Sequence, residues 1–279
     1  MAKVILKSLP LLAALMLSIS AQSQVIVNNE AQKQMFRAHV KQVDEFIDRF
    51  NCKSFTPGID TTKPDAKRLN LISLFPIETA KNSDTAYKTA TKFANHVLAS
   101  GVKLHYEDTT WFAMAQCRGK LKNKPVEFTL FLNVEHRRGN MYKWVISRAM
   151  GEIFALTPSN TIEMMISPSE HDINFMQLSR ITTEKDDLIL NYSQKQFDID
   201  QTSVFFTMVN QGLLDIEHVF NLQFVFMQVP GYQVTIEYID RLADNAGWLI
   251  KSAIPMTDSD KKSMLDFIYN RPNCDKKQK

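Results

Sequence analysis

Apolar residues in the first half of the chain recur at helical spacing and predict two helices. The first helix carries one apolar stripe with steps of three and four residues, which marks a single helix face. The stripe consists of Phe36, Val40, Val43, Ile47 and Phe50. The second helix can be capped by Ser83 or Asp84 and ends at Gly101, the usual C-terminal residue. Residues 55–76 carry three prolines, so we expect an irregular segment there with one short apolar element over residues 69–75.

The hydrophobic period then changes from helical spacing to two, which predicts strands. In the second of these strands, apolar residues from Val126 to Val134 alternate with mostly polar residues from Glu127 to Glu135. This alternation is typical of a half-buried antiparallel strand. Short turn-rich breaks separate the strands and favour an antiparallel meander. The expected strands cover residues 103–118, 126–136 and 142–154.

The second half of the chain repeats the order of helices followed by strands. A helix start is encoded by Ser167-Pro168-Ser169-Glu170, and Asp200 can cap a further helix that runs to about Leu214. A short strand candidate, 188–192, lies between these two helices. Three strands and a closing helix then follow, over residues 219–229, 232–240, 248–254 and 257–269.

The last strand of each half begins with a similar string of residues. These strings are Trp144-Val145-Ile146-Ser147-Arg148-Ala149 and Trp248-Leu249-Ile250-Lys251-Ser252-Ala253. Because both the order of elements and the local string agree, we interpret the chain as a diverged duplication. The fold class is therefore α+β, and we expect two tandem domains, over residues 24–156 and 157–279.

The N-terminus has the three parts of a secretory signal peptide. Lys3 and Lys7 precede an apolar run from Leu9 to Ile19, and Ala21 and Ser23 provide small residues at a cleavage site. We expect residues 1–23 to be removed, which makes the mature protein secreted or periplasmic. The apolar run is too short for a membrane span, so we expect no membrane span after cleavage.

Composition and charge narrow the class of protein further. The chain has 279 residues, 44% of them hydrophobic, and a formal net charge of +3. This composition excludes a disordered or collagen-like chain. This net charge is much smaller than that of a typical nucleic-acid-binding protein, which needs a strongly basic surface. Of the three cysteines, we expect Cys52 and Cys117 to form a disulfide, because an oxidising compartment permits one pair.

The common catalytic and cofactor motifs are absent from the sequence. There is no Gly-x-Ser-x-Gly elbow, phosphate loop or dinucleotide fingerprint, and the six histidines have no metal-ligand spacing. We therefore assign no catalytic residue, no cofactor and no metal site.

Helices followed by a meander whose last strand begins Trp144-Val145-Ile146 or Trp248-Leu249-Ile250 resemble NTF2-like (cystatin-like α+β) domains. The resemblance implies two tandem domains, each with helices packed on a curved antiparallel sheet around an open, cone-shaped pocket. Members of this superfamily include isomerases, dehydratases, ligand-binding proteins and interaction modules, so the fold does not select a function.

The resemblance also identifies candidate pocket residues. Members similar to ketosteroid isomerase combine an aspartate base with a Tyr–Asp oxyanion contact. In this chain Tyr106 and Asp108 lie two residues apart in a predicted strand, as do Tyr238 and Asp240, so each pair shares a face. Both aspartates fall at strand ends, where solvent is expected, and this favours pocket lining over catalysis. The tryptophans Trp111 and Trp248 complete the candidate set.

Three functions follow as hypotheses. The sequence favours a secreted, non-catalytic module that binds a small apolar ligand or a protein of the cell envelope. The first alternative is a small-molecule enzyme of the isomerase or hydrolase type that uses a cone-shaped pocket. The second alternative is a structural protein of the envelope that forms homodimers. A buried acid beside Tyr106 or Tyr238 would favour the enzyme.

Overall fold

The structure, a computed structural model, describes residues 43–76, 84–137, 141–155, 200–239 and 247–269. Within these residues the fold is α+β, as expected, with five helices and six strands. The helices are α2 (Val43–Phe50), α3 (Ala66–Ser73), α4 (Asp84–Ser100), α6 (Gln201–Asn210) and α7 (Asp258–Ile268), with a short 3-10 helix, η3 (Glu152–Phe154). The strands are β1 (Trp111–Leu121), β2 (Lys124–Arg137), β3 (Met141–Met150), β4 (Leu214–Phe226), β5 (Tyr232–Ile239) and β6 (Gly247–Pro255).

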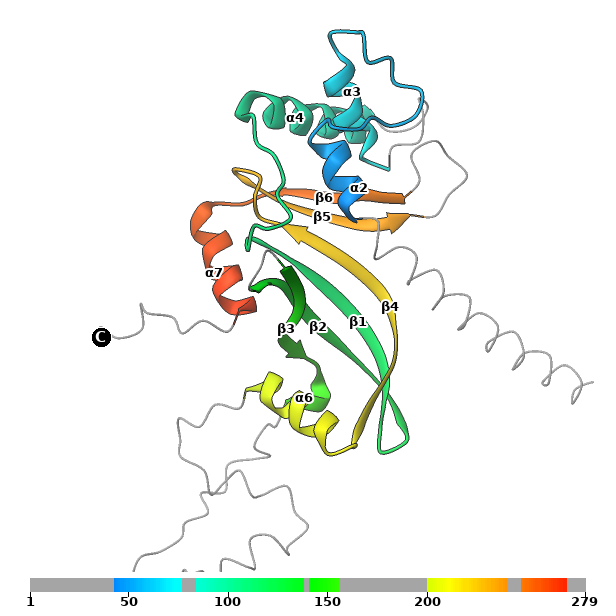
Figure 1. Cartoon of the computed structure of the whole chain (residues 1–279), viewed down its shortest axis with the longest axis vertical. Helices are drawn as coiled ribbons and strands as arrows, with labels where there is room; N and C mark the ends of the chain where they lie inside the picture. Colours follow the sequence, from blue (N-terminus) through cyan, green and yellow to red (C-terminus); the bar gives the residue numbers. More distant parts are fainter. Residues whose placement is uncertain (1–42, 77–83, 138–140, 156–199, 240–246, 270–279) are drawn as a thin grey trace, which may run out of the picture.

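All six strands form one open antiparallel sheet in the order β3-β2-β1-β4-β5-β6 (Figure 1). The two expected meanders are present, but β1 pairs along its whole length with β4, from Trp111 opposite Phe226 to Leu121 opposite Leu214. The described residues therefore show no sign of two tandem domains. The edge strand of one meander, β1, pairs with the edge strand of the other, β4, so both halves contribute to one sheet. The expected boundary at residue 156 lies outside the described residues.

The two faces of the sheet differ in what covers them. We call the face that carries Trp111 and Phe224 the inner face. Helices α2, α3 and α4 cover its end near β6 and bury the largest hydrophobic cluster, which includes Phe46 and Phe93. Helix α6 and η3 cover the other end of the inner face through Phe205 and Phe154. Helix α7 packs on the opposite, outer face against Phe112, Phe131, Val225 and Met227.

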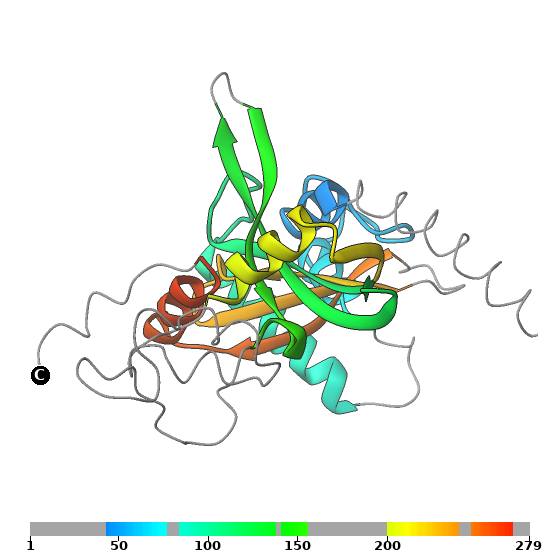
Figure 2. The ribbon, with the colours of Figure 1, turned by 90° about the horizontal axis from the view of Figure 1, so that it is seen from below.

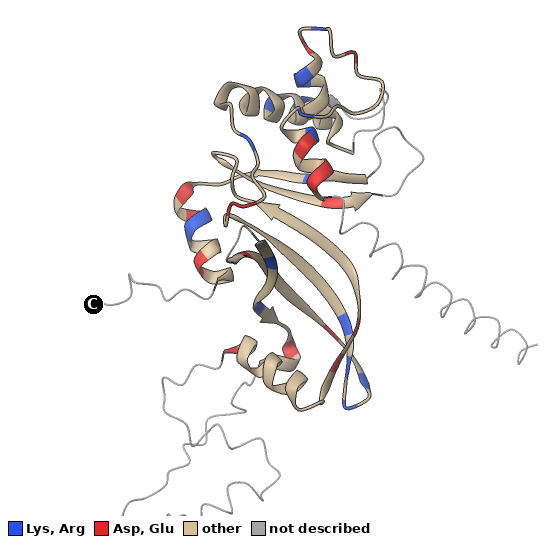
Figure 3. Ribbon diagram, viewed as in Figure 1, with Lys and Arg blue, Asp and Glu red and all other residues tan. Residues whose placement is uncertain are grey.

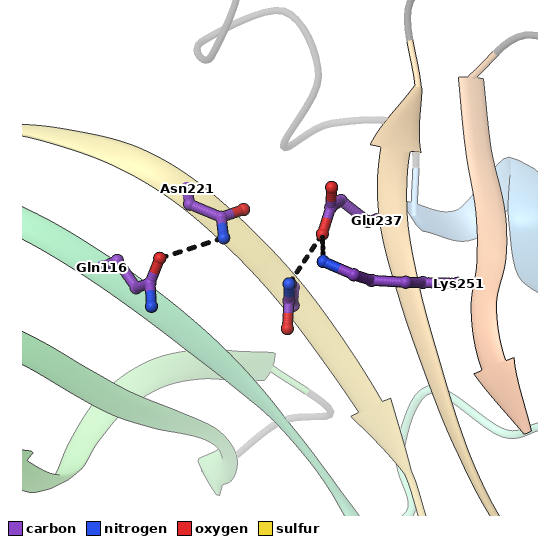
Figure 4. A network of polar contacts seen from close by, with 5 residues as sticks. Gln116, Asn221, Glu237 and Lys251 are labelled. Atoms are coloured by element: carbon purple, nitrogen blue, oxygen red, sulfur yellow. Dashed lines mark hydrogen bonds and ion pairs between the residues drawn. The ribbon is translucent and has the colours of Figure 1, made fainter. Parts of the chain in front are cut away.

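The outer face is polar where α7 does not cover it. The Lys251 ammonium lies 2.5 Å from Glu237 Oε2, and Gln223 Nε2 donates to the same oxygen at 2.6 Å (Figure 4). On the neighbouring strands Asn221 Nδ2 donates to Gln116 Oε1 at 3.0 Å. These cross-strand pairs make this part of the outer face polar, whereas the inner face carries the aromatic residues.

Several sequence expectations are confirmed by the element bounds. Helix α4 begins at Asp84 and is followed by Gly101 at φ +65°, the left-handed conformation that ends a helix. Asp200 caps α6, because its carboxylate accepts from the backbone N–H groups of Thr202 and Ser203. Helix α7 starts after Thr257, as predicted.

Two expectations about local structure are wrong. Residues 103–110 form a loop and not the start of the first strand, which begins at Trp111. Part of the segment expected to be irregular, residues 66–73, forms α3, and this helix contains most of the expected apolar element at 69–75 and buries Leu71 and Ile72. The first turns of the first predicted helix and the predicted elements at 167–181 and 188–192 lie outside the described residues.

Candidate functional site

The tryptophans of the two matching strings meet on the inner face. Trp144 lies on β3 opposite Val134, and Trp248 lies on β6 opposite Tyr238. Both indoles contact Phe224 of β4, with ring centroids 5.9 Å apart for Trp144 and 4.8 Å apart for Trp248. Strands β2 and β1 lie between Trp144 and β4, and β5 lies between Trp248 and β4. The matching strings therefore hold equivalent positions at the two edges of the sheet.

Four aromatic side chains of this region remain partly exposed, and we call them the aromatic surface: Tyr106, Tyr142, Trp144 and Tyr238. The Tyr106 and Tyr142 rings meet edge to face, 6.3 Å apart. Tyr238 meets the buried Trp248 edge to face at 5.8 Å, and Trp248 in turn contacts Phe224, on which Trp144 also packs. Beneath them the indole of Trp111 is fully buried, 5.2 Å from Trp144 and stacked on Phe226 at 5.0 Å. A buried aromatic layer thus supports an exposed one, which fixes the orientation of the exposed rings.

An acidic group lies beside the aromatic surface. Burial raises the pKa of the Tyr106 phenol, the negative charge of Asp44 raises that pKa further, and a hydrogen bond with Trp144 opposes both effects. The pKa of Asp44 itself is raised, first by desolvation and then by the charge of Asp48, but the residue is exposed, so it is not the buried acid that would favour an enzyme. Helix α2 carries a third acid, Glu45, so this rim is acidic, as Figure 3 shows.

The structure brings together four of the six candidate pocket residues and leaves out one of the others. Tyr106 and Trp111 are in contact, with centroids 5.2 Å apart, as are Tyr238 and Trp248. Asp108 is instead engaged in its own turn, where its Oδ1 accepts from the backbone N–H of Thr110 at 2.7 Å and from its hydroxyl at 2.6 Å. Asp240 lies outside the described residues. Tyr106 and Asp108 therefore lie in a loop, and the shared strand face that the sequence predicted for them does not form.

The two cysteines of the expected disulfide are free thiols in different layers. Cys52 is half-buried directly after α2, at φ +56°. Cys117 is buried in the middle of β1, within the cluster that α6 covers. Burial raises the pKa of the Cys117 thiol to about 11, which makes it a poor nucleophile. The structure does not bring this pair together.

Among the described residues, no group of three or more His, Cys, Asp or Glu side chains is placed to hold a metal ion. No helix in the described part of the chain is both long enough and apolar enough to cross a membrane. No protein-family model, curated protein or solved structure matches the chain.

The sequence does not predict three of the residues that build this region. Trp144 is predicted only as part of the repeated string, and Tyr142 only as the start of a strand. The sequence does not mark Asp44 as a site residue, because an acid in the first turn of a helix is expected from the helix dipole alone. A surface of this kind can hold a ring by stacking and can accept a hydrogen bond or positive charge at its acidic rim.

Proposed function

We propose that the chain is a secreted, non-catalytic binding module whose aromatic surface takes a small ligand with an apolar or aromatic ring. The observation that supports this proposal is the partial exposure of Tyr106, Tyr142, Trp144 and Tyr238 above a buried layer of rings. Rigid Tyr and Trp side chains provide a large contact area at low conformational-entropy cost. Side chains needed only for packing would gain more from complete burial.

The surroundings of the aromatic surface favour a ligand that also carries a donor group. Asp44 lies close enough to raise the pKa of Tyr106, and the imidazole of His136 packs 5.2 Å from the Tyr142 ring. A ring stacked on Trp144 could direct a hydroxyl or amino group to the acidic rim. The proposed ligand class is therefore an apolar ring with one polar donor.

We further propose that the two halves descend from one NTF2-like unit and that residues 1–23 direct the chain out of the cytoplasm. The mirrored strand order about the β1–β4 pair and the equivalent positions of Trp144 and Trp248 support the duplication. The positive, apolar and small-residue regions of the N-terminus support export.

The ligand proposal can be tested with the chain's own tryptophans. The sequence has three tryptophans, and Trp111, Trp144 and Trp248 all belong to the inner-face cluster. We expect N-phenyl-1-naphthylamine, an uncharged apolar ring probe with one N–H donor, to bind the folded mature chain and to emit by energy transfer when tryptophan is excited. Tyr142→Ala should weaken this binding by about tenfold, the effect of losing one well-packed aromatic contact of about 1.4 kcal/mol.

Phe206→Ala provides a matched control. Phe206 is also an exposed aromatic residue, 49% accessible, but it lies on α6 near the other end of the sheet. Probe affinity should not change in this variant. An equal loss in both variants, or no energy transfer at all, would contradict the proposal. Native mass spectrometry of protein purified from its own host would then identify any molecule that co-purifies with the parent chain and is missing from Tyr142→Ala.

A further inference from the structure

Three of the four side chains of the aromatic surface meet at steep angles, and we call Tyr106, Tyr142 and Trp144 the aromatic corner. The rings of Tyr106 and Tyr142 are almost perpendicular, at 82°, with centroids 6.3 Å apart. The indole N–H of Trp144 donates to the phenol oxygen of Tyr106, which holds these two side chains together. All three residues are partly exposed, so the corner presents ring surfaces in more than one direction.

Further rings support the aromatic corner. The buried indole of Trp111 lies 5.2 Å from the rings of both Tyr106 and Trp144, at 64° and 79° to them. The imidazole of His136 packs on Tyr142 at 66°. Figure 2 shows that the β2–β3 hairpin, which carries Tyr142 and Trp144, extends away from the rest of the sheet. Neighbouring rings at steep angles are the arrangement of an aromatic cage, a type of site that recognises organic cations.

One acid of α2 adds a negative charge beside these rings. Of the three acids in this helix, Asp48 lies 3.2 Å from the ammonium of Lys53. The charge of Glu45 acts on the buried guanidinium of Arg49. Asp44 is exposed, its charge acts on a phenol of the aromatic corner, and it forms no ion pair with any described residue. Its carboxylate is therefore available to a cation that contacts the rings.

The basic side chains of the described residues do not occupy the aromatic corner themselves. The cation–π contacts in this part of the chain are those of Arg118 and Arg148, each with a phenylalanine outside the corner. Lys143 is the neighbour of two corner residues in the sequence, but the alternation along β3 points its side chain to the opposite face. The cation that would match these rings must therefore come from a ligand.

We propose that the aromatic corner binds an organic ammonium group, protonated or alkylated, on a small ring-bearing ligand. The faces of aromatic rings attract cations, and the carboxylate of Asp44 adds to this attraction, whereas an anionic group would be repelled by both. A metal ion fits less well, because hard cations take several oxygen ligands and the described residues provide no such group. This inference rests on the ligand proposed for the aromatic surface and specifies that its polar group is a cation.

The test compares two probes that have the same shape and differ in charge. The cationic probe is 4-(hydroxymethyl)-N,N,N-trimethylanilinium, and the neutral probe is 4-tert-butylbenzyl alcohol. Both have a ring and a hydroxyl donor, so both belong to the ligand class proposed above. Binding to the folded mature chain is followed by the change in tryptophan fluorescence during titration. We expect the cationic probe to bind at least about fivefold more tightly than the neutral one.

Three variants locate the cation. Asp44→Asn should weaken binding of the cationic probe about three- to fivefold and leave the neutral probe unchanged. Asp215→Asn is the matched control, because it removes the same charge from an exposed acid at the start of β4, and it should change neither affinity. Tyr142→Leu keeps an apolar side chain but removes a ring face, so the preference for the cationic probe should fall at least about twofold.

The outcomes separate this inference from the proposed function. Equal affinity for the two probes, or tighter binding of the neutral one, would overturn the ammonium group and leave the ring ligand standing. Binding of neither probe would contradict the ring ligand as well. Equal losses in Asp44→Asn and Asp215→Asn would reduce the preference to net charge and would also overturn the inference. Co-sedimentation of the chain with phosphatidylcholine vesicles would overturn the small ligand in favour of a lipid headgroup.

Discussion

The side-chain amide of Asn70 holds the connection between α2 and α3 in place. Its Nδ2 donates to the carbonyl of Arg49 at 2.7 Å, and its Oδ1 accepts from the N–H of Thr56 at 2.9 Å. The residue is fully buried, so these bonds replace water that cannot enter. The sequence predicted an irregular segment where α3 forms because of its three prolines, and the long-range bonds of Asn70 that hold the segment leave no local pattern.

The buried thiol of Cys117 gives stability a defined pH dependence. Burial raises its pKa from its ordinary range to about 11, so the folded chain keeps this proton at pH values where the unfolded chain loses it. Stability is therefore fully present below the unfolded pKa near 9 and is lost as the pH rises towards 11. Between pH 8 and 10.5 we expect the parent chain to lose about 2 kcal/mol more than Cys117→Ala.

Urea unfolding of both chains under reducing conditions measures this difference. The variant carries every other titrating group of the parent, so the comparison isolates one thiol. Parallel pH profiles would show that Cys117 is accessible to hydroxide and solvent in the folded state.

At the scale of elements, local signals predicted helices and strands, and they failed where a long-range contact decides. Helix α4 and the cap of α7 follow from Asp84, Gly101 and Thr257, which act within one turn. The strand expected at Lys103 does not form because residues of the loop bond elsewhere. The N–H of Leu104 donates to Asn51 Oδ1 at 2.8 Å, and the N–H of His105 donates to Gln228 Oε1 at 2.7 Å.

Helix α7 is joined to the end of the sheet by a buried lysine. Lys261 is 6% exposed, and its ammonium donates to the carbonyls of Met227 at 3.0 Å and Val229 at 2.5 Å. Lys261→Met keeps most of the volume but leaves these carbonyls without a donor, so we expect a loss of about 1–3 kcal/mol in unfolding free energy.

Lys262→Met is the natural control for this prediction. The neighbouring Lys262 is exposed, and its substitution should change stability by less than about 0.5 kcal/mol. Chemical denaturation of the two variants gives the comparison, and equal stabilities would mean that water satisfies the carbonyls of Met227 and Val229 in place of Lys261.

For the whole molecule, the pairing of β1 with β4 is the feature that no local pattern specifies. The sequence indicates two meanders, and each one alone is compatible with a separate domain. What joins them is a close approach of backbones at the centre of the sheet, next to a bulge between Arg118 and Gly119. The aromatic surface depends on the same pairing, because Trp111 and Phe224 come from different halves. The sequence could therefore supply candidate residues for the site, but not the way in which they meet.

Gly119 makes this central pairing testable. A Cβ at this position would lie 2.2 Å from the backbone carbonyl oxygen of Asp215. Because that oxygen belongs to a paired strand and cannot rotate away, Gly119→Ala should cost more than about 3 kcal/mol or prevent folding. The measurement is the urea midpoint, or the soluble yield if the chain does not fold.

Gly101→Ala serves for comparison. There an added methyl group meets nothing within 4 Å, and only the φ of +65° is unfavourable, so a loss of about 1 kcal/mol is expected. If Gly119→Ala were no worse than Gly101→Ala, the two strands would have room to separate, and the central pairing would be looser than it is here.

The pairing of β1 with β4 also determines when the sheet can be completed during synthesis. The chain emerges from its N-terminal end, so β1, β2 and β3 are complete long before Leu214–Phe226 has been made. During that interval the nascent meander has an open edge on β1 as well as on β3, and open edges pair readily with other chains. Contacts between segments so far apart also form slowly. The half-made protein is therefore most exposed to aggregation just before β4 arrives, and a chain that stops short of Phe226 leaves the middle of its own sheet as a surface for misassembly.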